Sequence, residues 1–222
     1  MSQLTAPSQS ITQTRSSTTW RLAGGLAIAH LVMIFAAITQ EVMVEHNTPI
    51  ATLQAKFGGA DLTRVFAAGY VEALASLIMV PAIVLLTHSF GNHTETGRLA
   101  AQTFLALGIV YVAATLAVGF APGAAAMYGA QHGADVHTVA VVNDIRNYGF
   151  MLQVALEGAM ALALAVAALA EGIGRRWVGY GGLAAGALVI VGMPFAHNAV
   201  DMAWMVWWLG LAVILLRGPQ SA

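Results

Sequence analysis

The chain has 222 residues, of which 59% are hydrophobic and only 9% are charged, and its mean hydropathy is +0.75. Soluble domains carry about 25% charged residues, so this composition excludes an ordinary soluble enzyme. The formal net charge of −1 leaves no basic surface for nucleic acid, and the absence of cysteine excludes disulfides, thiolate catalysis and cysteine-bound metals.

In chain order, residues 1–19 come first and are rich in Ser, Thr and Gln, which is typical of a disordered tail. Six apolar segments follow, close to the length of about 20 residues that crosses a bilayer: 20–43, 65–86, 99–121, 145–170, 177–195 and 200–216. Gly and Pro residues lie at the ends of these segments and predict helix ends, among them Pro122-Gly123 after the third segment and Pro194 at the end of the fifth. We therefore predict an all-α, polytopic transmembrane bundle with six spanning helices, forming one domain over 20–217 with a short tail at 218–222.

Lys and Arg residues in the loops predict the orientation of the bundle, because cytoplasmic loops carry more of them. Six lie on the side of the termini (Arg15, Arg21, Arg98, Arg175, Arg176 and Arg217), and three lie on the other side (Lys56, Arg64 and Arg146). We predict a multi-pass protein of the plasma membrane with both termini in the cytoplasm, including the tail at 1–19.

Two carboxyl side chains lie well inside apolar segments, away from their ends: Glu72 in the second and Glu157 in the fourth. A charged carboxylate facing lipid at a helix centre costs about 2.5–3.5 kcal/mol on insertion scales. Each therefore faces protein or water, pairs with another group or is protonated. Intramembrane ionisable residues are candidates for function.

Helical spacing collects further polar residues near these two. Arg146, Gln153 and Glu157 are spaced i, i+7, i+11 and fall on one stripe of the fourth segment. Asp201 lies in the sixth segment, one turn after His197. We predict a polar cavity open to the outside, lined by Glu41, Glu72, Arg146, Gln153, Glu157, His197 and Asp201. Of these, Glu72, Arg146, Gln153, Glu157 and Asp201 are the predicted ligand-binding residues. Glu41 is predicted to share a face of the first helix with His30.

A structural interpretation competes with this one, because polar side chains commonly tie membrane helices together at about 0.6 kcal/mol each. Under that interpretation Arg146 neutralises Asp201, and His30 makes a structural hydrogen bond. The tryptophans at 204, 207 and 208 either wall an apolar ligand pocket or fill the core.

A metal site is a further hypothesis, and not the favoured one. His197 and Asp201 at i, i+4 present an imidazole and a carboxylate on one helix face, with Glu41 as a third ligand. Two other groups of His and acidic residues lie in the outer segments, at 41–46 and 132–137. None of them matches a known metal-binding signature.

A resemblance to other proteins covers the layout of the whole chain loosely and residues 176–217 more specifically. The sequence RWVGYGGLAAG at 176–186, followed by WWLG at 207–210 and LLR at 215–217, resembles small bacterial membrane proteins of unknown function with six predicted spans. The resemblance implies an integral membrane protein with cytoplasmic ends, and it brings no catalytic residue.

The sequence thus favours a membrane protein that binds or permeates a small polar or cationic solute. One alternative is a metal-assisted intramembrane enzyme or redox protein, with His197 and Asp201 in the site. Another is a non-catalytic subunit or scaffold whose Gly and Ala faces dock another membrane protein or a second copy of the chain. Nucleic acid is not expected as a partner.

Overall fold

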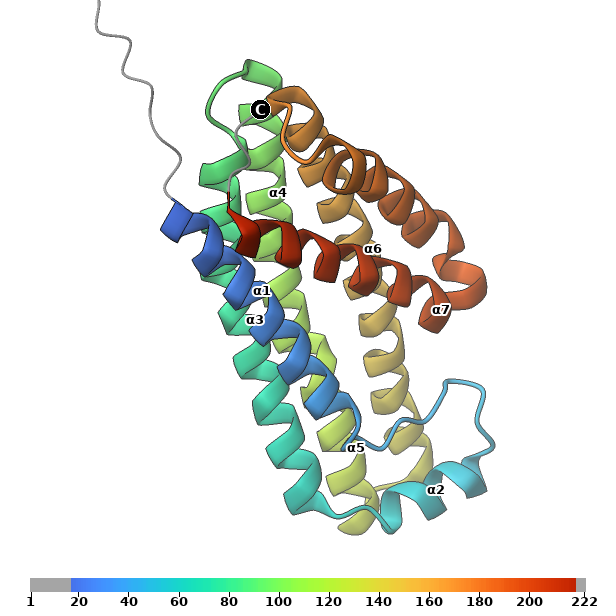
Figure 1. The fold of residues 1–222 in the computed structure, drawn as a ribbon. Coiled ribbons are helices and arrows are strands. Elements are labelled where there is room, and N and C mark those ends of the chain that lie inside the picture. The colour runs from blue at the N-terminus through green and yellow to red at the C-terminus, as the bar shows by residue number, and fades with distance from the viewer. Residues whose placement is uncertain (1–16, 219–222) are drawn as a thin grey trace, which may run out of the picture.

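The computed structural model describes residues 17–218, which form helices and no strand (Figure 1). The elements are α1 (Ser17–Ile38), α2 (Ile50–Gly58), α3 (Leu62–Phe90), α4 (Glu95–Ala114), the π-helix η1 (Thr115–Gly119), α5 (Phe120–Gln131), α6 (Val136–Glu171), the π-helix η2 (Arg175–Gly181) and α7 (Gly182–Arg217). Six stretches are long and apolar enough to cross a membrane. The predicted all-α transmembrane bundle is therefore confirmed.

The six observed spans correspond in order to the six predicted segments, with shifted ends. They are Ser17–Ile38, Leu62–Phe90, Glu95–Gln131, Val136–Glu171, Arg176–Ala196 and Ala199–Arg217. The first helix begins inside the predicted tail, at Ser17, and most of that tail lies outside the described residues. The fourth span ends where predicted, because Gly172 (φ 72°) adopts the left-handed conformation that commonly closes a helix.

The predicted end of the third span at Pro122-Gly123 is wrong, because helical structure continues to Gln131. The backbone changes from the α-helix α4 to the wider π-helix η1 at Thr115–Gly119, and the α-helix α5 begins at Phe120. Pro122 therefore stands in the first turn of α5, where the missing N–H has no intrahelical partner to lose.

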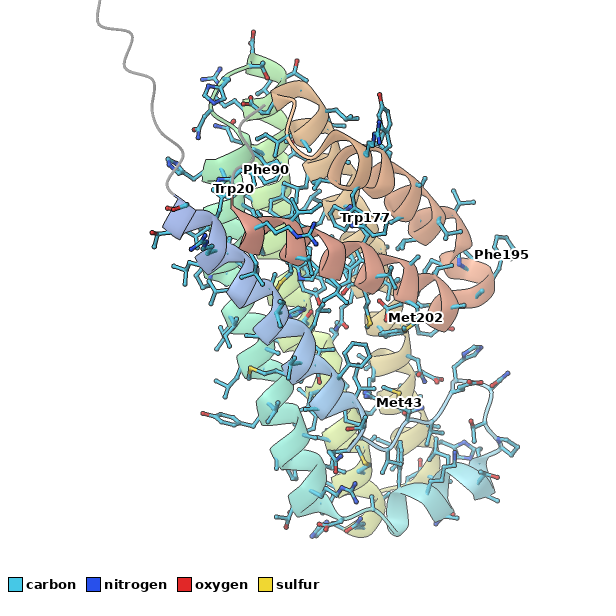
Figure 2. The ribbon with its side chains drawn as sticks, in the orientation of Figure 1. Trp20, Met43, Phe90, Trp177, Phe195 and Met202 are labelled. Atoms are coloured by element: carbon cyan, nitrogen blue, oxygen red, sulfur yellow. The ribbon has the colours of Figure 1, made fainter. Side chains whose placement is uncertain are left out.

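The fifth span consists of most of η2 and the first arm of α7, and the sixth span is the second arm of α7. The backbone leaves helical geometry at Ala196 (φ −153°, ψ 50°), two residues after Pro194, and the second arm turns back toward the start of α1. Phe195 points away from the bundle at this bend (Figure 2) and is 85% exposed. The break predicted at Pro194 is thus present as a bend.

The two ends of the bundle differ in what they carry (Figure 1). Ser17 and Gly218 lie next to each other at one end, here called the terminus end. The opposite end, here called the α2 end, carries α2, α5 and the start of α6. A helix of 36 residues such as α6 is about 54 Å long, against about 30 Å for the hydrocarbon core of a bilayer. The long helices therefore extend past the hydrocarbon region.

Each end has its own hydrophobic cluster. The larger cluster fills the terminus end and includes Trp20, stacked on Phe90 with ring centroids 5.7 Å apart (Figure 2). The smaller cluster packs α2 against α5 and α6 through Leu53, Phe57 and Met127. The chain between the first and second predicted segments thus contains α2, and α5 extends beyond the predicted end of the third segment.

Small residues bring the helices into close contact. A side-chain carbon at Gly186 would lie 2.6 Å from the carbonyl oxygen of Gly158, and one at Gly182 would lie 2.9 Å from Ala165. The Gly182/Gly186 face is therefore used within the chain, between α6 and α7. The outer faces carry exposed apolar side chains such as Val32 and Val191, as contact with lipid requires.

Candidate functional site

A cavity of about 600 Å³ is lined by residues of α1, α2, α3, α4, η1, α6 and α7 and of the segment between α1 and α2. All five residues predicted to bind a ligand line it: Glu72, Arg146, Gln153, Glu157 and Asp201. The further lining residues are Ile34, Ile38, Glu41, Met43, Val44, Glu45, Thr48, Thr52, Lys56, Tyr111, Thr115, Gly119, Asn147, Phe150, Val154 and Met205. The cavity thus joins residues from six α-helices and the π-helix η1.

Helix geometry explains how α6 contributes to the cavity. Arg146, Gln153 and Glu157 fall on one stripe as the spacing predicts, and all three face the cavity. Asp201 enters from the second arm of α7, just after the bend. The bend returns the chain toward α6, so that Asp201 reaches the cavity lined by the α6 stripe.

Arg146 forms an ion pair with Glu41, and both side chains are largely buried (13% and 3% exposed). The predicted pairing of Arg146 with Asp201 is therefore wrong. Glu41 lines the cavity, but its predicted place on the first helix is wrong, because α1 ends at Ile38 and Glu41 lies in the segment that follows.

The segment after α1 is held against α6 by side-chain hydrogen bonds. The amides of Asn143 and Asn147 both donate to the carbonyl oxygen of Val44, at 3.1 Å each. The guanidinium of Arg64 donates to the side chain of Gln40 at 2.6 Å. These contacts position Glu41 over Arg146, although Glu41 is not on a helix.

Two carboxyl pairs face the cavity. The first consists of Glu72 and Glu41, whose side chains interact with each other beside Arg146. The second consists of Glu157 and Asp201, which interact next to the hydroxyl of Tyr111. The first pair has a cation beside it, whereas the second has none among the described lining residues.

The π-helix η1 contributes a glycine to the cavity wall beside the first carboxyl pair. A side-chain carbon at Gly119 would lie 3.0 Å from both Gln153 Nε2 and Glu72 Oε1, so the glycine lets these polar groups approach the backbone. Short π-helical turns occur frequently at functional sites. Here η1 also contributes Thr115 to the cavity wall.

Several buried polar atoms at the cavity have no hydrogen-bond partner in the part of the chain that the structure describes. They include Glu72 Oε2, Gln153 Nε2 and Glu157 Oε2. The residues Gln153 and Glu157 are only 8% and 6% exposed. Buried polar groups are satisfied in nearly all native structures, and a proton on a carboxyl group, a water molecule or a polar ligand would satisfy these three atoms.

The charges lining the cavity are unbalanced. Five of the ten acidic residues of the chain line it, against two basic residues, Lys56 and Arg146. Lys56 is exposed on α2 and Arg146 is paired with Glu41. The deep part of the cavity, around Glu157 and Asp201, therefore contains two carboxyl groups and no basic side chain among the described lining residues.

The predicted metal ligands are only partly described. Glu41 and Asp201 line the same cavity, but the side chain of His197 lies outside the described residues. Among described side chains, no group of three or more His, Asp or Glu residues could hold a metal ion. The metal site stays a prediction.

The two other His and acidic groups do not form metal sites among the described residues either. In the group at 132–137, Asp135 caps α6 by accepting from the backbone N–H of Thr138 at 3.0 Å, and this bond lowers the pKa of its carboxyl. His132 Nδ1 donates to the carbonyl of Tyr128 at 2.8 Å.

Other polar residues of the spans have structural contacts. His30 Nδ1 donates to the carbonyl of Ala75 at 2.9 Å, as the structural interpretation predicted. Ser76 donates to the backbone carbonyl of Glu72 at 3.0 Å. Trp204 and Trp208 stack in the buried core, with ring centroids 5.3 Å apart, and they do not line the cavity.

Sequence reasoning missed the contribution of the third span. Tyr111, Thr115 and Gly119 follow one another at intervals of four residues and line the cavity. This i, i+4 spacing was visible in the sequence, but one hydroxyl every turn in an apolar segment is also common in packed helices. The apolar lining residues carry no such signal.

No protein-family model matches the chain, and no curated protein or solved structure is significantly similar to it. The resemblance of residues 176–217 to small six-span bacterial proteins stays a prediction. The function must therefore be argued from the cavity.

Proposed function

We propose that this integral membrane protein binds a small cationic solute in the acidic cavity, as a step in its binding or permeation. The observation that carries the proposal is the convergence of Glu72, Glu157 and Asp201 on one cavity, in which buried carboxyl and amide atoms have no hydrogen-bond partner among the described residues. Buried carboxylates need a compensating charge or a proton. A bound cation would supply that charge.

The position of the cavity supports binding from one side. Its lining includes exposed residues of the α2 end, such as Glu45, Thr52 and Lys56. Toward the terminus end the bundle is filled by the larger hydrophobic cluster, including Trp204 and Leu164. With the orientation predicted from the Lys and Arg residues, the solute would enter from outside the cell.

The test is equilibrium binding to the full chain in lipid nanodiscs at constant pH. The titrants are sodium, potassium, magnesium, methylammonium and 2-phenylethylammonium. At least one of them should bind, and Glu157→Gln should weaken that binding at least tenfold, because it removes a charged hydrogen-bond acceptor.

The matched control is Glu95→Gln, the same chemical change at an exposed position in the first turn of α4. It should leave binding unchanged. The proposal is contradicted if none of the five cations binds below about 10 mM, or if Glu157→Gln and Glu95→Gln bind them equally well.

A further inference from the structure

The cavity has an apolar wall as well as an acidic one. Ile34 and Ile38 line it from α1, Phe150 and Val154 from α6, and Met205 from α7. Asp201 and Met205 are one turn apart on α7, and Val154 and Glu157 are adjacent on the α6 face. Val154 and Met205 thus lie within a helical turn of the second carboxyl pair.

The size of the cavity matters for the kind of cation. About 600 Å³ falls within the 300–1,000 Å³ of sites for organic ligands and cofactors. A dehydrated inorganic ion would touch a small part of such a wall, and no described group of three His, Asp or Glu residues could surround it. An organic cation with an apolar body would contact both walls.

The unpartnered atoms indicate which kind of organic cation fits. Glu72 Oε2 and Glu157 Oε2 are hydrogen-bond acceptors without donors among the described residues. A primary ammonium group carries three N–H donors, whereas a quaternary ammonium group carries none. Hydrogen bonds to charged groups are the stronger ones, so the acceptors select for N–H bearing cations.

On the assumption that the proposed function holds, we infer that the solute is a protonated organic amine with an apolar body. Its ammonium group donates to the carboxyls of Glu157 and Asp201. Its apolar body lies between Ile34 of α1 and Phe150 of α6, with Tyr111 beside the ammonium group. In this arrangement the apolar wall contacts the body of the amine, and the unpartnered oxygen of Glu157 accepts a hydrogen bond from its ammonium group.

The experiment compares three ligands of one shape in the same nanodisc titration. 2-Phenylethylammonium should bind. The neutral 2-phenylethanol lacks the charge, and the trimethylated quaternary analogue lacks the N–H donors, so each should bind at least tenfold more weakly. Methylammonium, which lacks the apolar body, should also bind at least tenfold more weakly.

A pair of variants on one helix tests the apolar wall. Ile34→Ala removes three carbons from the cavity wall and should weaken 2-phenylethylammonium about fivefold, with a smaller effect on methylammonium. Val32→Ala is the matched control, because Val32 is 61% exposed on the outer face of α1 and does not line the cavity. It should change neither affinity.

The outcomes separate this inference from the proposed function. If sodium, potassium or magnesium binds in a manner that depends on Glu157 and the amine does not, the inference is wrong and the proposed function stands. Equal affinity for the amine and its quaternary analogue, or for the amine and the alcohol, also overturns it. If no cation of the panel binds, both fail.

Discussion

Arg146 is largely buried beside the cavity, and its partner is a residue outside the helices. Its guanidinium pairs with Glu41, which is itself held by the fold of the segment after α1. The side chain of Arg146 also packs against Gly123, where an added carbon would lie 2.5 Å from Arg146 Cδ. The pair therefore connects the segment after α1, α5 and α6 at one point.

We predict that Arg146→Gln strongly destabilises the protein, because it leaves Glu41 buried without a counter-ion. Breaking a buried pair in this way costs about 3–5 kcal/mol. The double variant Glu41→Gln with Arg146→Gln should recover most of that loss, since it removes both charges. Thermal unfolding in detergent measures both, and a double variant as unstable as Arg146→Gln alone would contradict this account of the pair.

The residues of the cavity show which contacts the sequence could predict. The α6 stripe followed from spacing, because three residues on one rigid helix keep their phase. Glu41 could not be placed in the same way, since its position depends on hydrogen bonds from Asn143 and Asn147 to the carbonyl of Val44. Such contacts join segments about 100 residues apart and leave no periodic signal.

At the scale of the helices, α1 packs against the last arm of α7 through one of two adjacent glycines. A side-chain carbon at Gly24 would lie 2.8 Å from the carbonyl oxygen of Ala212 and 3.0 Å from the backbone nitrogen of Leu216. At Gly25 the same carbon would have nothing within 4 Å. The two positions therefore make a matched pair.

We predict that Gly24→Ala destabilises the protein by about 1–3 kcal/mol, because backbone atoms of α7 would have to move. Gly25→Ala should be neutral or stabilise by up to about 1 kcal/mol, because alanine favours the helix over glycine. Unfolding midpoints of the two variants in one detergent check this. Equal destabilisation by both would show that α1 and α7 are not packed as described.

The number and order of the helices followed from hydropathy, because a bilayer requires long apolar segments. The ends of the helices did not follow from hydropathy, and each error in the predicted ends has an identifiable cause. Pro122-Gly123 predicted a helix end, but η1 and the first turn of α5 accommodate the proline. The helix α2 is nine residues long and is stabilised by packing of Leu53 and Phe57 in the smaller cluster, so its sequence alone does not reveal it.

In the molecule as a whole, the few charged residues are concentrated at one site. Half of the ten acidic residues line one cavity, although charged residues are only 9% of the chain. The larger hydrophobic cluster occupies the terminus end, and the cavity lies toward the α2 end. We infer that this cavity is accessible to water from the α2 end and attracts cations.

The natural chain contains no cysteine, so a single introduced thiol can test this claim directly. Thr115→Cys places a thiol in the cavity wall, and Ser76→Cys places one at a fully buried position that does not line the cavity. The measurement is the rate at which charged, water-soluble methanethiosulfonate reagents modify each thiol in sealed vesicles of known orientation.

We expect the thiol of Thr115→Cys to react when the reagent is added on the side of the α2 end. The reaction should be at least tenfold faster with a cationic reagent than with an anionic reagent of similar size. Ser76→Cys should not react. A thiol at position 115 that is unreactive from that side, or that prefers the anionic reagent, would contradict a water-accessible acidic cavity.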